Sequence, residues 1–220
     1  MAGFRKAWIR AENYKKLKIE YYEKSPSARE LLDPPIRDLQ LDTLAGVLDG
    51  NILVQNHCYR ADEMAMMIEM SHEFNYQITA FHHAVEAYKI ADLLADEGIC
   101  GALWADWWGF KHEAYDMVPA NIAIVDQARG GTGCAIVHSD DEVGIQHLNQ
   151  EAAKALIAGI RAGYDISKAR AMRWITSNPA IAAGIFDQTG SIEVGKDADL
   201  VIWSGDPFSV YSIAEKDFID

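Results

Sequence analysis

The 220-residue sequence has little cysteine, and its three cysteines, Cys58, Cys100 and Cys134, are widely spaced and form no CxxC pair. An odd number of scattered cysteines does not indicate a disulfide framework, so we expect three buried thiols. The sequence also lacks an apolar run long enough to span a bilayer, and it does not open with a signal peptide. These features favour a soluble protein of undetermined compartment with no membrane partner.

Basic residues are scarce: 20 lysines and arginines stand against 33 aspartates and glutamates, which gives a formal net charge of -13. Such a surface repels polyanions, so nucleic acid is excluded as a partner. The one basic stretch, residues 5–24, alternates with apolar residues and is typical of an amphipathic helix with a solvated Lys/Arg face. Half of the residues are hydrophobic, which is the usual composition of a globular domain.

The middle of the chain, after a Pro/Asp-rich connector at 25–38, alternates between apolar runs and helical patterns. The apolar runs predict strands at 51–56, 76–81, 99–103 and 134–137, and the segments that follow them predict helices at 61–74, 86–95, 121–128 and 143–161. Strand-then-helix units in a row imply parallel strands joined by crossover helices. A doubly wound sheet, a piece of a (β/α)8 barrel and a complete small α/β domain all fit this α/β pattern.

The last part of the chain changes character. Two short helices are expected at 166–175 and 179–185, the second opened by the Asn178-Pro179 pair. From Gly190 the sequence becomes turn-rich, and 198–203 predicts a strand. We therefore expect a separate β unit to begin near Gly190.

Possible metal ligands stand at three of the four predicted strand ends. His57 ends the first run, His82 and His83 end the second, and the segment 138–141 (His-Ser-Asp-Asp) follows the fourth. Because ligands bind at the carboxyl ends of parallel strands, these side chains are expected on one face, where imidazole and carboxylate suit a catalytic zinc or a similar divalent ion. A hydrogen-bonded neutral histidine and a helix-capping aspartate are the alternative interpretations, and spacing alone does not choose between them.

Several motifs resemble a known family. The segments 57–62 (HCYRAD), 83–89 (HAVEAYK) and 138–140 (HSD) resemble strands five, six and eight of the amidohydrolase superfamily, with the character of its imidazolonepropionase-like and Xaa-Pro-dipeptidase-like branch. The segments 176–180 (TSNPA) and 190–201 (GSIEVGKDADLV) resemble the passage from that family's barrel into its β-sandwich domain. The resemblance covers nearly the whole chain.

This resemblance implies a fold and a domain organisation. The chain would be the C-terminal half of a metal-dependent hydrolase TIM barrel, comprising strands five to eight of the (β/α)8 fold. Residues 1–50 would be an N-terminal helix and connector, residues 51–189 the second half of the barrel, and residues 190–220 the start of the β-sandwich.

The resemblance also implies roles for individual residues. His57 and His83 would be metal ligands, and Asp140 would contact the metal and carry a proton from the activated water to the leaving amine. The cofactor would be a divalent metal, most often zinc, and the substrate a small molecule with a non-terminal or cyclic amide bond, or a dipeptide. Position alone, apart from the resemblance, gives weaker substrate-binding roles to Tyr59 and Arg60 after the first ligand, and to Trp108 and Lys111 in the aromatic loop after the third strand. The alternative interpretations are a structural hydrogen bond for the first two, core packing for the aromatic loop and a solvated side chain for the lysine.

The chain departs from the family pattern in its first part. It contains no His-x-His pair and no equivalent of the strand-four lysine, so it is expected to be a fragment with at most half of a binuclear site. A half-barrel would expose two strand edges, and we expect homo-oligomerisation or other self-association through them. The alternative function is a non-catalytic metal-binding or oligomerisation remnant. A nucleotide-binding domain lacks support, because the glycine-rich stretch 130–133 precedes a strand instead of following one.

Overall fold

The computed structural model describes residues 1–107 and 109–219. These residues form two compact units. The first unit comprises Met1–Val54 and Met66–Ile78, and the second comprises the remaining described residues. No helix formed by the described residues has the length and apolarity that a membrane crossing requires.

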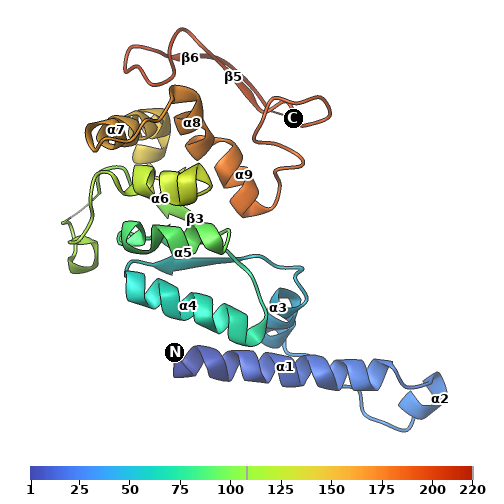
Figure 1. Cartoon of the computed structure of the whole chain (residues 1–220). Coiled ribbons are helices and arrows are strands. Elements are labelled where there is room, and N and C mark those ends of the chain that lie inside the picture. The colour runs from blue at the N-terminus through green and yellow to red at the C-terminus, as the bar shows by residue number, and fades with distance from the viewer. Residues whose placement is uncertain (108, 220) are drawn as a thin grey trace. The chain divides into compact units, whose positions relative to one another are not determined.

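The helices and strands alternate through the middle of the chain (Figure 1). The strands are β1 (Val54–Cys58), β2 (Ile78–His83), β3 (Cys100–Leu103), β4 (Cys134–Val137), β5 (Leu200–Trp203) and β6 (Ala214–Phe218). The α-helices are α1 (Ala2–Tyr22), α2 (Pro26–Arg29), α3 (Leu39–Leu48), α4 (Ala61–Phe74), α5 (Ala91–Asp96), α6 (Asn121–Gly131), α7 (Leu148–Arg161), α8 (Lys168–Met172) and α9 (Ser177–Ala183). Single 3₁₀ turns are η1 (Ala87–Ile90), η2 (His112–Ala114), η3 (Gly144–His147) and η4 (Arg173–Ile175).

The first unit contains α1 and α3, which lie side by side (Figure 1). Asp42 of α3 joins them, because its carboxylate accepts hydrogen bonds from the Tyr14 hydroxyl and the Lys18 ammonium, each at 2.8 Å. Hydrogen bonds from Lys18, Arg37 and Tyr14 hold the pKa of the Asp42 carboxyl well below its usual range. The helix α3 was missed by the sequence analysis, although Asp38 marks its start by accepting the backbone N–H of Gln40.

The second unit contains a four-stranded sheet in the order β1-β2-β3-β4. β2 pairs with β3 and β3 pairs with β4, both in parallel, as the alternation of strands and helices predicted. His83, Leu103 and Val137 are register partners and form one row across these strands. Residues directly after this row therefore meet at the carboxyl edge of the sheet.

The strand bounds differ from the prediction at β1 and β2. The predicted runs 51–56 and 76–81 stop before the histidines, whereas the observed strands continue through His57 and His83. The cause is that sheet hydrogen bonds join backbone groups, so a strand continues through polar residues that break the apolar pattern. The strand β4 and the helix α4 lie where the sequence predicted them.

Two glycines allow the helices of the second unit to approach their neighbours. A Cβ atom on Gly133, just before β4, would overlap the carbonyl oxygen of Val125 in α6. A Cβ atom on Gly159 in α7 would lie 2.5 Å from the Cβ of Ala123. Because both positions lack a Cβ, α6 packs closely against both β4 and α7.

A buried carboxylate anchors α6 to the helices that follow α7. Asp126 is fully buried, and its side chain accepts hydrogen bonds from Arg170 Nε at 2.9 Å and from Trp174 Nε1 at 2.8 Å. Arg170 also donates to the backbone carbonyl of Gly131 at 2.6 Å. A buried charge is stable only when it is paired and hydrogen-bonded, and these contacts satisfy that condition.

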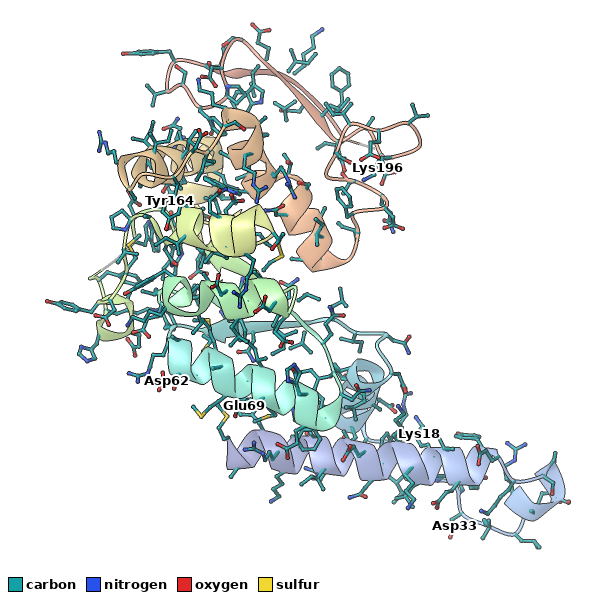
Figure 2. All side chains as sticks on the ribbon, in the orientation of Figure 1. Lys18, Asp33, Asp62, Glu69, Tyr164 and Lys196 are labelled. Carbon is teal, nitrogen blue, oxygen red and sulfur yellow. A yellow bond between two sulfur atoms is a disulfide. The ribbon has the colours of Figure 1, made fainter. Side chains whose placement is uncertain are left out.

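The end of the second unit is a two-stranded antiparallel sheet of β5 and β6, preceded by turns. The strand β5 lies within the range predicted from the sequence. Lys196, labelled in Figure 2, ties the turn region together because its ammonium donates to the Phe186 carbonyl and to Ser191 Oγ. Its nitrogen also lies 3.6 Å from the centroid of the Phe186 ring.

The expectation of three free thiols is wrong for two of the cysteines. Cys100 and Cys134 form a disulfide, because the parallel register makes them partners on adjacent strands with their Cα atoms 4.5 Å apart. Cys58 is a buried free thiol, as expected. Burial and the nearby negative charge of Glu63 raise the pKa of the Cys58 thiol to about 11.

We therefore expect the folded, non-reduced chain to react with no thiol reagent at pH 8, since the Cys58 thiol is buried and protonated there. Unfolding in denaturant without reductant should release one reactive thiol, and unfolding after reduction should release three. A colorimetric thiol titration measures all three numbers. Three reactive thiols without reductant would contradict the disulfide.

Replacing Asp126 by alanine should destabilise the fold by about 3–5 kcal/mol, because the change leaves the Arg170 guanidinium without its carboxylate partner. Urea unfolding followed by circular dichroism measures the difference. The matched control is Asp96→Ala, which removes an exposed partner of Arg129 and should change stability little. Equal losses in both variants would show that burial of Asp126 does not matter.

Candidate functional site

Histidines and aromatic residues meet at the carboxyl edge of the sheet. His57 lies in β1, His82 and His83 end β2, and Trp104 and His138 follow β3 and β4 directly. The backbone hydrogen bonds between β3 and β4 continue one residue past the end of β4, because the backbone N–H of His138 donates to the Leu103 carbonyl at 3.1 Å. The sheet register thus places side chains from four separate segments in one cluster.

Two of the three predicted metal ligands face each other directly. His57 Nδ1 and His83 Nε2 are 2.7 Å apart, so one proton is shared between two imidazole nitrogens. The third predicted ligand, Asp140, lies on the other side of the His83 ring, with its Oδ2 3.7 Å from His83 Nδ1. The Asp140 side chain is half exposed, and its backbone is in the left-handed region with φ of 54°.

Two strand-end histidines to which the family resemblance assigned no role, His82 and His138, belong to the same cluster. The His82 ring stacks on His57 with a centroid distance of 5.1 Å, and its Nε2 is hydrogen-bonded to Gln55 at 2.7 Å. The His138 ring stacks on Trp104 at 5.4 Å and lies 5.3 Å from His83. The signal that marked them was their position at the strand ends, shared with His57 and His83.

Three of the six buried side-chain polar atoms that lack a hydrogen-bond partner among the described residues lie in this cluster. They are His83 Nδ1, Trp104 Nε1 and His138 Nε2. The three rings contact one another, since His83 lies 4.7 Å from Trp104 and 5.3 Å from His138. Unsatisfied buried polar atoms are rare in folded proteins and concentrate at functional sites.

Burial favours the neutral form of three imidazoles of this cluster, those of His82, His83 and His138. It lowers the pKa of His83 to about 4; the neighbouring His57 and Lys111 lower this pKa further, and Asp140 opposes the shift. Burial lowers the pKa of His138 to about 3, and the pKa of His82 also falls. Neutral imidazole is the form that donates a lone pair to a metal ion.

The donor set fits a divalent ion in part. Two nitrogen ligands of a tetrahedral zinc lie roughly 3.3 Å apart, so His57 Nδ1 and His83 Nε2 fit one ion after separating by roughly 0.6 Å. Among the described residues, no three His, Cys, Asp or Glu side chains converge as a complete metal site. His57 and His83 are therefore the pair suited to hold an ion, with Asp140 beside the pair.

The weaker predicted site residues have different surroundings. Tyr59 stacks on His83 with a centroid distance of 5.0 Å, and its hydroxyl contacts the Lys111 ammonium. Arg60 instead forms an exposed ion pair with Asp62, which Figure 2 labels in the first turn of α4. Trp108 lies outside the described residues.

Comparison with known sequences points to one family. Residues 151–219 match the profile described as "Amidohydrolase family". The amidohydrolase tasK of Hapsidospora irregularis is 31% identical over 188 residues, which cover 83% of this chain and 18% of that protein. Urease subunit alpha 2 of Streptomyces coelicolor is 32% identical over 127 residues, which cover 47% of this chain and 23% of that protein. The chain thus spans about a fifth of the length of the curated relatives it matches.

Comparison with solved structures agrees. An amidohydrolase from Thermotoga maritima superposes with a TM-score of 0.78 and 29% identity, covering 97% of this chain and 54% of that chain. An adenosine deaminase from Xanthomonas campestris with bound zinc has a TM-score of 0.54 and 20% identity, covering 76% of this chain and 40% of that chain. The second likeness is one of fold alone.

The lowered histidine pKa values predict a dependence of stability on pH. Between about pH 6.5 and pH 4 the unfolded chain binds protons that the buried His83 and His138 do not, so stability falls as the pH falls. From pH 7.5 to pH 5 we expect a loss of about 2 kcal/mol for each of these histidines in the metal-free chain.

Urea unfolding at several pH values measures this loss. His138→Gln should lose about 2 kcal/mol less than the wild type over the same interval. The exposed His147→Gln is the control and should keep the wild-type slope. Identical slopes in all three proteins would contradict a buried neutral His138.

Proposed function

The chain belongs to the amidohydrolase superfamily, and from this premise we propose that it carries part of the active site of a metal-dependent hydrolase. The proposed reaction is cleavage of an amide-type C–N bond by an activated water molecule. The observation that carries the proposal is the facing pair His57 Nδ1 and His83 Nε2, 2.7 Å apart at the carboxyl edge of a parallel sheet.

The proposed fold context is the second half of a (β/α)8 barrel, with the four strands of the sheet as strands five to eight. The order β1-β2-β3-β4 supports this, because consecutive strands are neighbours, as they are in such a barrel. The amidohydrolase from Thermotoga maritima supports it too, since this chain covers 54% of that one. Active sites of such barrels lie at the carboxyl ends of the strands, where the histidine cluster lies.

His57 and His83 are the proposed ligands of the ion. When bound, a divalent cation supplies Lewis acidity and activates a water molecule as the nucleophile. Zinc is the proposed ion, because imidazole nitrogens suit it and the structurally similar deaminase holds zinc. His82 positions the His57 ring by stacking on it, while its own Nε2 is fixed by Gln55.

Asp140 is the proposed proton carrier. Its carboxylate is half exposed and lies next to His83, so it can reach a water molecule beside the ligand pair. One carboxylate oxygen accepts the proton from that water and then donates it to the nitrogen of the leaving amine. The Tyr59 ring stacks on the His83 ring, and we propose that it forms one wall of the space that holds the substrate carbonyl.

Zinc binding by the purified chain tests the ligand assignment. Isothermal titration with zinc should show near-stoichiometric binding by the wild type, and His57→Ala and His83→Ala should each weaken it by at least tenfold. His147→Ala replaces an exposed histidine of η3 and should bind like the wild type. Unchanged zinc affinity in both ligand variants would contradict the proposal.

The zinc-loaded chain also tests Asp140. Hydrolysis of a panel of N-acyl amino acids, cyclic amides and dipeptides should fall by at least about 100-fold in Asp140→Asn, because proton transfer contributes that much. Zinc affinity should fall far less than in His57→Ala. Full activity in Asp140→Asn would contradict the role of Asp140 as the proton carrier.

A further inference from the structure

The ammonium group of Lys111, in the loop after β3, lies among three aromatic rings. Its ammonium nitrogen lies 4.3 Å from the centroid of the Tyr59 ring, 5.1 Å from that of Phe110 and 5.8 Å from that of Trp104. Tyr59 is half-buried and Trp104 is buried, so two of the three rings belong to the packed interior of the site. Aromatic rings at these distances attract a cation, and they cover part of the ammonium from water.

The charge of Lys111 is not neutralised by the protein. An ammonium has three N–H donors, and the acceptor that Lys111 contacts is the Tyr59 hydroxyl. Within residues 1–107 and 109–219 no carboxylate forms an ion pair with it, whereas Lys89, Lys154 and Arg170 of the same unit each have an acidic partner. Lys111 is thus a half-buried cation whose N–H donors have only one acceptor among the described residues, the Tyr59 hydroxyl.

This cation stands next to the proposed ion ligands. The Tyr59 ring stacks on His83 with the planes only 16° apart, and the same residue contacts Lys111 through its hydroxyl. Trp104 likewise lies against His83 at 4.7 Å and beneath Lys111 at 5.8 Å. Tyr59 and Trp104 therefore each contact both the Lys111 ammonium and the His83 ring.

We propose that Lys111 binds a carboxylate of the substrate, so that the substrates are amides that carry a carboxylate close to the bond that is cleaved. This inference rests on the proposed function. A carboxylate supplies acceptors for the N–H donors of Lys111 that have none, and its negative charge pairs with the half-buried ammonium. One lysine matches a singly charged group, whereas a phosphate dianion would call for further cations or a bidentate arginine.

The test uses two probes that differ only in charge, N-acetyl-L-alanine and its neutral amide, N-acetyl-L-alaninamide. Both are titrated into the metal-free chain, so that a carboxylate has no ion to bind. The readouts are tryptophan fluorescence and the indole NMR signal of Trp104. The acid should bind at least tenfold more tightly than the amide.

Variants of Lys111 then locate the site. Lys111→Met should weaken binding of the acid at least tenfold and leave the amide unchanged, and Lys111→Arg should restore the acid to within threefold. Lys216→Met removes an equal charge from β6 and should bind the acid like the wild type. Near-ultraviolet circular dichroism checks that each variant is folded.

Three results would overturn the inference: equal binding of acid and amide, no binding of either probe, or unchanged acid binding in Lys111→Met. Zinc titration of Lys111→Met separates this inference from the proposed function. If Lys111→Met loses acid binding but keeps the zinc affinity of the wild type, the carboxylate site at Lys111 is supported, whatever the hydrolysis assay gives. The opposite outcome has two parts: the wild type binds no zinc, and His57→Ala binds the acid as tightly as the wild type does. That outcome would contradict the proposed function and leave the carboxylate site supported.

Discussion

Backbone hydrogen bonds between β2, β3 and β4 hold His83, Leu103 and Val137 side by side, and the features of the second unit follow from this register. The residues that come next along each segment, among them Trp104 and His138, must then lie together at one edge of the sheet. The same register opposes Cys100 to Cys134 at the other end of these strands, where a disulfide joins them. A shift by one residue would separate both the cluster and the disulfide, since alternate residues face opposite sides.

The helices behind the sheet hold this register in place through a few buried contacts. Glycines 133 and 159 let α6 approach β4 and α7 closely, and Asp126 then ties α6 to Arg170 and Trp174 beyond α7. These interactions are polar as well as apolar, and each polar atom involved has a partner. In the described part of the second unit, the buried side-chain nitrogens without a partner lie instead at the histidine cluster, and such atoms are most often found at functional sites.

The histidine cluster and Lys111 are two parts of one environment. Burial favours the neutral form of His83 and His138, which can donate a lone pair, while the Lys111 ammonium lies among aromatic rings beside them and has no acidic partner among the described residues. Tyr59 belongs to both parts through its ring and its hydroxyl. A substrate amide at the ligand pair with an anionic end at Lys111 would satisfy the groups that the protein leaves unpaired.

The sequence by itself determined the alternating strands and helices, the parallel sheet and the superfamily, because hydrophobic periodicity and short motifs are local properties of the chain. It also marked His57, His82, His83 and His138 as histidines at strand ends, and the family motifs singled out His57 and His83 as ligands. Only the tertiary structure decided that the rings of His82 and His138 pack against this pair, that Asp140 lies beside the pair instead of on it, and that Cys100 meets Cys134 across 34 residues. These facts depend on strand register and loop conformation, which arise from contacts between distant segments and leave no periodic trace in the sequence.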